Sequence, residues 1–590
     1  MPHRYRKSSS STASAYPKEI TNRRKTWRRV LIIGAFALLI TILTYSPAVP
    51  PKARNAAQRM SPFNKPAAHK PPSRDDDTLG DATWFGSLKW LHPFSDSINS
   101  EDSRVVLPPL RKRPPIYSFY DDLADKDDAI KEEESKLLLI WRRAWWAQGF
   151  KPVILGRAEA KANMLSTEVN KLDLEQALDV EMMRWLAWGH MGNGVLANWL
   201  VLPMGPRDDQ VLSYLRQGDY RELRRYEGLG AGLFSGHKDA INNAIRDALQ
   251  STKLTTARSM VEVVGKSSWT IEPQSNSIAF YDTNALTEYY RSVSTALTED
   301  KAAGLGKLSQ LIISHLHLNF LNTFGTGIAV VSPYAAYTKV LTEWALTLAT
   351  ALVKCPKSPL PSSCPPNNQK CSTCSASRPL TITSSESFFN TSSKYTIGTV
   401  PHPYTFAALR YPNKEITLAH IRRNTPRDPW LEMVTADILG TTIGGYDRIS
   451  PFKETVASEW GAANGLWLTE DPKLIPKQKD LEWHFGWPLP LLNTSEVSMM
   501  SNADKSARRA LELQQHLLHE AKIVIQSGDG KGKSHVQAGI RKITEAWSLA
   551  DAEAWRFVRS LGAREKQERK KWEDGEKRYA GGKDIGRPEG

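Results

Sequence analysis

Three aspartates, at two places in the sequence, are candidates for metal-dependent or acid–base chemistry. Asp208 and Asp209 are adjacent carboxylates after a Gly-Pro pair, and Mg²⁺ and Mn²⁺ prefer carboxylate oxygens as ligands. Aspartates in such a context are also typical of a turn or a helix cap, and we favour that interpretation. Asp282 follows the strand-like run SIAFY. Ligands of α/β sheets sit beyond the carboxyl ends of strands, so Asp282 is a candidate base, although a turn-forming aspartate is the better explanation.

His315 and His317 lie in the apolar run LIISHLHLNF. If this run is a strand, residues two apart point to the same face, and two imidazoles could then bind one metal ion. No aspartate, glutamate or cysteine near them completes such a site. We therefore expect two ordinary strand histidines and predict no metal site.

The four cysteines all fall within one Pro/Ser-rich segment: Cys355, Cys364, Cys371 and Cys374. Their spacing, C-x8-C-x6-C-x2-C, departs from the paired CxxC knuckles of zinc sites. Two disulfides across a surface loop in an oxidising compartment fit better, with the pairing left open. The N-glycosylation sequons at Asn390 and Asn493 are compatible with the same compartment.

The N-terminal region predicts where this chemistry takes place. An uncharged, mostly apolar run from Val30 to Val49 follows a basic tail, and a transmembrane helix needs roughly 20 such residues. The positive-inside rule keeps the tail in the cytosol, which predicts a single-pass type II protein of the Golgi or endoplasmic reticulum membrane. A signal peptide cleaved near Ser46-Pro47-Ala48 is the alternative, but its basic region would be unusually long.

The composition is that of a large globular protein. The net charge is +15, and the tail before Val30, with nine Lys or Arg and one Glu, supplies +8 of it. The remaining basic residues are spread out, so we predict no nucleic-acid partner. Tryptophans and other aromatics are dense between 460 and 487; they could line an acceptor-sugar groove, but we take them as core.

The order of elements predicts an α/β fold with a mixed, mostly parallel sheet and helical cover. Leu137–Trp141 is expected to be a buried strand, Arg142–Gln148 a short helix and Lys151–Leu155 a second strand, which together would form a βαβ unit. Glu181–Trp188 is expected to be helical. His237–Gln250 is amphipathic, with apolar residues on one helical face.

The region from about Lys136 to Pro333 resembles the nucleotide-sugar-binding half of glycosyltransferases with the GT-A fold. It is closest to the fungal and bacterial group with a DXD sugar-binding region. The resemblance rests on the order of a Trp-containing helix, an Arg-containing helix, a Gly pair, an apolar strand, the segment 226–249 and the late strand-like run 328–333. It implies a nucleotide-sugar donor site lined by Arg184, Gly192, Gly194 and Asn198.

The chain departs from this pattern at the motif that normally binds metal. With Gly194 as the second glycine of the pair, the DXD position falls on Asn198-Trp199-Leu200. Both carboxylates are missing, so a role for Mn²⁺ or Mg²⁺ is doubtful. Either Arg or Lys stabilises the phosphates without a metal, or Asp208-Asp209 replaces the motif, or the fold has lost its activity.

These observations predict the following organisation: a basic cytosolic tail (1–29), a transmembrane signal anchor (30–49), a Pro-rich stalk and docking segment (50–115), a GT-A-like domain (116–354), a Cys/Ser/Pro-rich insert (355–392), the second half of the lumenal domain (393–500), C-terminal helices (501–562) and a charged tail (563–590). We expect a glycosyltransferase that moves a sugar from a nucleotide sugar to a glycan or glycolipid. The alternative is a non-catalytic, membrane-anchored lumenal protein that binds glycan or a partner glycosyltransferase, and a signal-cleaved secreted protein is a third reading.

Deletion of Val30 to Tyr45 is expected to release the protein from membranes, because this run supplies the apolar length that holds a chain in the bilayer. The measurement is the fraction of protein that pellets with membranes after carbonate extraction. Continued carbonate-resistant pelleting of the deletion variant would rule out a single anchor.

Overall fold

The structure is a computed structural model that describes residues 67–72, 107–121, 126–254, 256–331, 339–384, 393–400, 453, 456–469, 476–490 and 535–579. The predicted anchor at 30–49 and the sequons at Asn390 and Asn493 lie outside these residues. Within the described part, no helix has the length and apolar character needed to cross a membrane.

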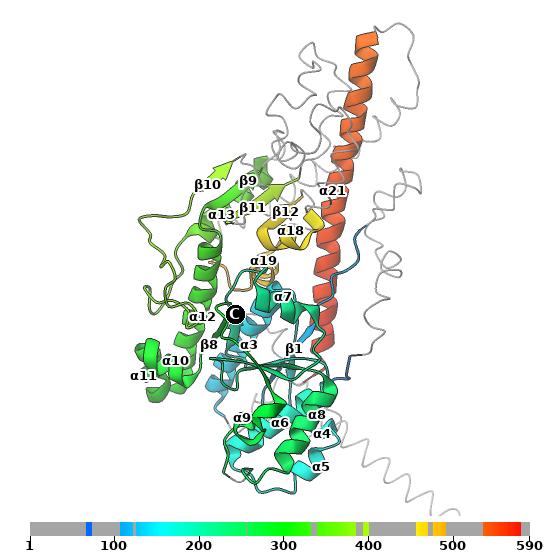
Figure 1. Cartoon of the computed structure of the whole chain (residues 1–590). Helices are drawn as coiled ribbons and strands as arrows, with labels where there is room; N and C mark the ends of the chain where they lie inside the picture. Colours follow the sequence, from blue (N-terminus) through cyan, green and yellow to red (C-terminus); the bar gives the residue numbers. More distant parts are fainter. Residues whose placement is uncertain are drawn as a thin grey trace, which may run out of the picture. The chain divides into compact units, whose positions relative to one another are not determined.

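The first half of the fold is built on a six-stranded mixed sheet (Figure 1). Its strands, in the order β2-β1-β3-β6-β5-β7, are Lys151–Leu155, Pro115–Phe119, Gly194–Ala197, Leu233–Gly236, Arg224–Tyr226 and Thr270–Glu272. β1 pairs in parallel with β2 and β3, and β5 with β7, whereas β6 runs antiparallel to both of its neighbours. The predicted mixed, mostly parallel α/β architecture is therefore confirmed.

Side-chain alternation along the strands divides the core into two layers. Ile116 and Val195 belong to one buried cluster, and Tyr117 and Leu196 belong to the other, as expected where successive side chains point to opposite faces of a sheet. The helices packed on the second cluster are α4 (Arg157–Ala162), α5 (Ser166–Val169), α6 (Gln176–Met191), α8 (Lys238–Leu249) and α9 (Met260–Val263). A short 3₁₀ helix, η4, covers Lys266–Ser268. The predicted amphipathic helix is α8, which buries Ile241, Ala244, Ile245 and Ala248.

The second half contains a smaller sheet whose strands are all parallel, in the order β10-β9-β11-β12. These strands are Ile382–Ser384, Gly327–Val331, Lys394–Thr399 and Gly465–Leu468. The helices of this half are α10 (Thr283–Tyr289), α11 (Arg291–Glu299), α12 (Lys301–Thr323), α13 (Lys339–Val353), α18 (Glu459–Asn464) and α19 (Gln478–Phe485). A two-stranded antiparallel ribbon joins β4 (Val201–Pro203) to β8 (Ile278–Phe280). In the sequence, β4 and helix α7 (Gln210–Gln217) lie between β3 and β5, and β8 follows β7.

Helix α3 (Asp128–Ala147) connects the two halves. It follows β1 and precedes β2, which forms the βαβ unit, and it also packs against α12, α19 and β4. The prediction of a strand at Leu137–Trp141 is wrong, because this run lies in the middle of α3. The run is continuously apolar because this part of α3 is packed on several sides. A short apolar run does not by itself distinguish a strand from a buried helix.

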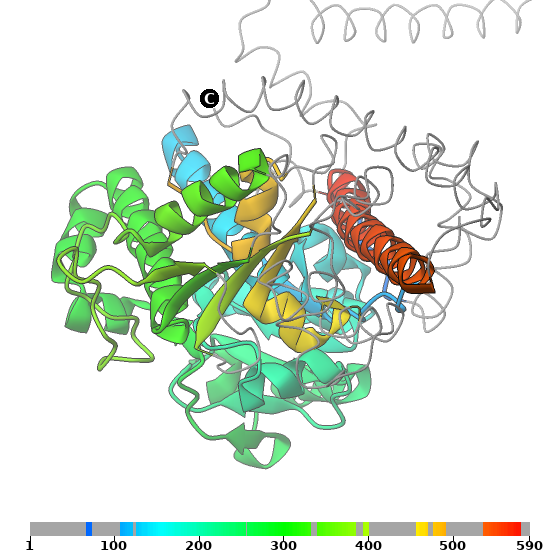
Figure 2. The same ribbon diagram turned by 90° about the horizontal axis from the view of Figure 1, so that it is seen from above.

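A buried ion pair joins α3 to α19. Arg143 Nη2 lies 2.8 Å from Glu482 Oε2, and the two side chains are only 2% and 7% exposed. On the same helix, Trp146 stacks with Trp572 of the C-terminal helix α21 (His535–Glu576) and packs edge-on against Trp483 of α19. In Figures 1 and 2, α21 is a single long helix on the side of the fold away from α10 and α11.

Two predicted boundaries differ from the structure. The charged tail was expected to start at 563, but α21 continues to Glu576 and buries Ala563, Arg564 and Trp572. The mixed charges of this segment suggested a solvated tail. In the structure, however, a basic residue such as Arg569 forms an ion pair with Asp480 and lies over the ring of Trp483. The predicted stalk, 50–115, also includes a residue packed on the body, since His69 is buried.

His69 lies between two carboxylates from distant parts of the chain. Its Nδ1 is 2.8 Å from Glu159 Oε1 on α4, and its Nε2 is 3.2 Å from Glu576 Oε2 at the end of α21. Its ring stacks on Tyr579 with a centroid distance of 3.5 Å, and its carbonyl accepts from His190 Nε2. Burial lowers the pKa of His69, but the hydrogen bonds to Glu159 and Glu576 outweigh it and raise the pKa to about 8.

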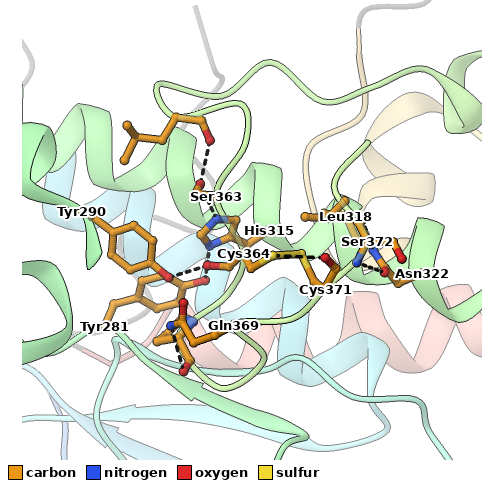
Figure 3. The surroundings of a disulfide bond; sticks show 12 residues. Tyr281, Tyr290, His315, Leu318, Asn322, Ser363, Cys364, Gln369, Cys371 and Ser372 are labelled. Atoms are coloured by element: carbon orange, nitrogen blue, oxygen red, sulfur yellow. Dashed lines mark hydrogen bonds between the residues drawn. A yellow bond between two sulfur atoms is a disulfide. The ribbon is translucent and has the colours of Figure 1, made fainter. Parts of the chain in front are cut away.

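The four cysteines form two nested disulfides in the loop after α13, Cys355–Cys374 and Cys364–Cys371. This loop packs on α12. Ser363 Oγ lies 3.0 Å from His315 Nε2, and the carbonyl of Cys364 accepts from Tyr290 at 2.6 Å (Figure 3).

The substitution Glu482→Gln is expected to destabilise the fold by about 3–5 kcal/mol, because it leaves the buried Arg143 guanidinium without its counter-charge. The measurement is the shift of the unfolding midpoint in urea. The control is Glu133→Gln, which removes a more exposed pair with Lys136 on the same helix and should cost less than about 1 kcal/mol. Equal effects of the two variants would contradict a special role of the buried pair.

Stability is expected to depend on the protonation of His69. Because the folded-state pKa of about 8 lies above the unfolded value of 6.5, the stabilisation is fully present below pH 6.5 and is lost as the pH rises through 8. The shift corresponds to a change on the order of 2 kcal/mol. The melting temperature, measured from pH 6 to 9, should fall more steeply in the wild type than in His69→Gln. Parallel curves would show that the His69 contact contributes no pH dependence.

Candidate functional site

A cleft of about 750 Å³ lies where the two halves meet. We call it the central cleft. Its walls come from the end of α3, the loop after β4, α7, the end of α12, the start of β11, α18 and the end of α19. Cavities of this size hold small-molecule ligands in other proteins.

The end of helix α3 fixes the position of two arginines. The last carbonyls of a helix have no partner within it and carry partial negative charge. The Ala147 carbonyl accepts from Arg207 Nη1 at 3.1 Å, and the Trp146 carbonyl accepts from Arg113 Nη1 at 2.8 Å. Gly149 turns the chain here with φ +90, and a Cβ at this position would lie 2.8 Å from Arg207 Nη2.

Arg207 and Arg216 lie side by side in the wall of the central cleft. Glu459 bridges them, with its Oε1 3.5 Å from Arg207 Nε and 3.1 Å from Arg216 Nε, and Arg216 Nη2 also donates to the Arg207 carbonyl. Burial lowers the pKa of Arg207 to about 9, and the charges of Arg216, Arg113 and Arg111 act in the same direction. Arg216 Nη1 is buried and has no partner among the residues that the structure describes.

The predicted acidic pair is at the central cleft, and one member has a structural role. Asp209 is the N-cap of α7, where its Oδ1 accepts from the N–H groups of Val211 and Leu212 at 2.9 and 3.1 Å. The same oxygen accepts from Ser277 Oγ at 2.7 Å. Asp208 lines the cleft with its side chain exposed. The helix-cap interpretation therefore describes Asp209, whereas Asp208 is available to a ligand.

Aromatic residues and a neutral histidine line another part of the central cleft. His484 Nε2 lies 2.8 Å from the hydroxyl of Tyr395, and burial, with a further contribution from the charge of Arg207, lowers the pKa of His484 to about 4. Phe485 and Trp487 complete this wall. Trp487 is 5% exposed, and its Nε1 has no partner within the described part of the chain.

The residues implied by the GT-A resemblance as a donor site do not line the central cleft. Arg184 is buried in α6, where it donates to the Ala231 carbonyl at 2.8 Å and lies 3.2 Å from Glu181. Gly192 and Gly194 both have positive φ, and a Cβ on Gly194 would lie 2.5 Å from a ring atom of Tyr117. These three residues have structural roles in the packing of α6 and β3.

Asn198 closes the turn between β3 and β4. Its carbonyl accepts from the N–H of Val201 at 2.9 Å, and its side-chain Oδ1 accepts from the N–H of Leu200, also at 2.9 Å. The side chain thus stabilises the local backbone in an Asx turn. The one oxygen that this segment could offer to a ligand already has a partner.

Asp282 and the two histidines are also structural. Asp282 is the N-cap of α10 and accepts from the N–H of Ala285 at 2.8 Å. The expectation that His315 and His317 lie on a strand is wrong, because both are in α12. Residues two apart in a helix point in nearly opposite directions.

The two histidines accordingly have different neighbours. His315 Nδ1 lies 2.8 Å from the Tyr281 hydroxyl (Figure 3), and burial lowers its pKa to about 3. His317 Nε2 donates to the Leu352 carbonyl at 2.7 Å, and its ring stacks on Trp487. No cluster of three or more metal-binding side chains is present among the described residues.

Sequence reasoning missed Arg207, Arg216 and Glu459 as members of one site. They come from a loop, from α7 and from α18, and nothing in their spacing indicates that they converge. The aromatic density near residue 484 was the one available signal: His484, Phe485 and Trp487 do line the cleft, while Trp483 belongs to a buried cluster with Trp146 and Trp572.

Comparison with known proteins gives a family without an assigned activity. A family model described as a domain of unknown function, DUF8765, matches residues 78–590. No curated protein and no solved structure matches the chain. Since the family match covers most of the sequence, this chain belongs to the DUF8765 family.

Proposed function

We propose that the protein is a glycosyltransferase of the secretory pathway that binds a nucleotide sugar in the central cleft and transfers the sugar to a glycan or glycolipid. The observation that carries the proposal is the pair of guanidinium groups, Arg207 and Arg216, in the wall of a cleft of about 750 Å³. The mixed α/β sheet is compatible with a GT-A-like fold, which forms part of the proposal.

The arginine pair can perform the task that a metal ion performs in DXD enzymes. A departing nucleoside diphosphate carries negative charge, and arginine binds phosphate oxygens with two parallel hydrogen bonds. Arg216 Nη1 is an N–H group without a partner in the described structure. Because both arginines are largely buried, their charges are weakly screened by water and act strongly on a phosphate nearby.

The other walls of the central cleft suit a sugar and an acceptor hydroxyl. Phe485 and Trp487 give one wall an apolar, aromatic lining, and Trp487 Nε1, which is buried in this wall, has no partner within the described residues. Asp208 is the exposed carboxylate of the cleft loop and is the candidate base for the acceptor hydroxyl. His484 is neutral at neutral pH because of its lowered pKa, so it adds no further charge to the site.

Compartment and topology are part of the same proposal. The apolar run at 30–49 would anchor the chain, and most of the protein would face the Golgi or endoplasmic reticulum lumen. The two disulfides of the loop after α13 support this placement, because disulfides persist in oxidising compartments and are rare in the cytosol.

The alternative is a non-catalytic lumenal protein that uses the central cleft to bind a glycan or a partner glycosyltransferase. The geometry of Asn198 favours it, since the residue at the DXD position has become part of a turn and its side-chain oxygen is already paired. The two functions differ in whether a nucleotide sugar binds and is consumed.

The full-length chain in mild detergent is expected to bind at least one nucleotide sugar with micromolar affinity, with or without Mn²⁺, because guanidinium groups replace the metal. Isothermal calorimetry against uridine and guanosine diphosphate sugars is the measurement. Arg216→Gln should weaken binding at least tenfold. Arg221→Gln, which alters an exposed arginine outside the central cleft, should change it less than twofold.

The outcomes separate the two functions. Consumption of the bound donor in the presence of a glycan acceptor supports the enzyme. Failure of the folded protein to bind any nucleotide sugar, together with binding of a glycan, would establish the non-catalytic alternative. Binding that requires Mn²⁺ would refute the metal-free arrangement.

A further inference from the structure

A second cavity, of about 280 Å³, lies next to the central cleft. We call it the basic cavity. It is lined by residues 108–113 ahead of β1, by α18 and β12, by α19 and by the part of α21 from Val558 to Arg569. Arg207 borders both cavities, whereas Arg216 lines only the central cleft and Arg113 only the basic cavity.

Among the residues that the structure describes, the lining of the basic cavity holds more basic than acidic side chains. Three of these lining residues are acidic, Asp480, Glu565 and Glu568, and two carboxylates beyond the lining also pair with its arginines, Glu459 with Arg207 and Glu573 with Arg569. The basic residues of the lining outnumber them and are Arg111, Lys112, Arg113, Arg207, Arg559, Arg564, Lys566 and Arg569. A small cavity with such an excess of positive charge favours a bound anion, because like charges in a partly desolvated space repel one another.

The acidic residues do not remove this imbalance. Asp480 pairs with two cations at once, since its Oδ2 is 2.9 Å from Lys566 Nζ and its Oδ1 accepts from Arg569. Glu568 Oε1 is 3.8 Å from Arg113 Nε, and burial raises the pKa of Glu568 above its usual value. Part of the negative charge of the cavity is thus already shared or weakened.

The arginine geometry limits the kind of anion. The Arg113 guanidinium lies over the ring of Trp146, with its carbon 4.1 Å from the ring centroid, and its Nη1 donates to the Trp146 carbonyl. Arg564 is fixed by donation to the Pro108 carbonyl at 2.5 Å. Several planar guanidinium groups held in place match tetrahedral phosphate groups, which accept several hydrogen bonds each.

We propose that the basic cavity is a binding site for a diphosphate group, carried by a small soluble phosphoanion and separate from the donor site of the central cleft. The cavity is too small for a whole nucleotide sugar but can hold two linked phosphates. The inference does not rest on the proposed function, because Arg207 is the one arginine or lysine in the described lining of the basic cavity that also lines the central cleft.

Binding would join three segments that are far apart in the sequence. Lys112 and Arg113 precede the first strand, Asp480 is on α19, and Arg569 is on α21. An anion that contacts all three would hold α21 against the body of the fold. The ligand should therefore protect α21 from hydrogen exchange, in addition to raising the melting temperature.

The experiment uses the full-length chain and inorganic pyrophosphate as the probe, with calorimetry and hydrogen exchange of residues 554–576 as readouts. We expect saturable binding that weakens with salt, and slower exchange in α21. Lys112→Glu should weaken binding at least tenfold; the side chain is exposed, so the fold should be retained. The matched control is Lys577→Glu, the same charge change at an exposed lysine of the α21 end that does not line the cavity, and it should change affinity less than twofold.

Two further comparisons complete the test. Arg216→Gln, which can affect a second binding event in the central cleft, should leave the pyrophosphate concentration that slows exchange in residues 554–576 within twofold of the wild type. A tenfold rise of that concentration, with no change in Lys112→Glu, would place the protecting anion in the central cleft and overturn the proposal. Uridine diphosphate separates free diphosphate from nucleotide-borne diphosphate. Equal affinity for pyrophosphate and uridine diphosphate supports recognition of the diphosphate alone. Binding of the nucleotide without binding of pyrophosphate would refute the proposal. Failure of the folded protein to bind either compound would also refute it.

Discussion

The burial of helix α3 is the constraint on which the rest of the structure depends. The helix covers one face of the six-stranded sheet and at the same time packs against α12 and α19 of the second half. The part of α3 from Leu137 to Trp146 is packed on several sides and is apolar almost all round, with Arg142 and Arg143 as its charged residues. The buried Arg143 is tolerated because Glu482 lies 2.8 Å away, and this contact also fixes α19 against α3.

The C-terminal end of α3 connects this packing to the candidate sites. Its last carbonyl groups accept from Arg113 and Arg207, which belong to segments before and well after the helix. Arg207 supplies a hydrogen bond to the Ala147 carbonyl, and Arg113 adds one to the Trp146 carbonyl, which also accepts from the Gly149 N–H. Both arginines line a cavity. The position of positive charge in the site thus follows from how a buried helix ends.

Charge rather than metal coordination distinguishes the region between the two halves. The described acidic residues that the sequence suggested for catalysis or metal binding are mostly occupied, since Asp209 and Asp282 both cap helices. The pKa of Arg207, in contrast, is lowered by burial and further by the charges of the nearby arginines. An arrangement of this kind is compatible with an anionic ligand in the central cleft and with a second anion beside it.

In the loop after α13, local disulfides fix the shape of the loop, and contacts to distant residues attach it to the fold. The disulfides Cys355–Cys374 and Cys364–Cys371 close the loop upon itself. Its attachment to the fold comes from polar contacts to buried side chains, among them Ser363 to His315 and Tyr290 to the Cys364 carbonyl. His315 is neutral there because burial lowers its pKa, so it serves as an uncharged hydrogen-bonding partner.

The sequence by itself determined the features that depend on neighbouring residues. The helices α6 and α8, the strand β2 and the capping role of an aspartate before α7 follow from periodicity, glycine placement and side-chain preferences over a few residues. The first strand of the βαβ unit does not, because it is β1 and not the predicted run Leu137–Trp141. The tertiary structure alone decided that Leu137–Trp141 is helical and that His315 and His317 point apart, because long-range burial makes an apolar run ambiguous. It alone also brought Arg207, Arg216, Glu459 and His484 to one cleft, since such convergence is set by the packing of segments that are up to 277 positions apart in the chain.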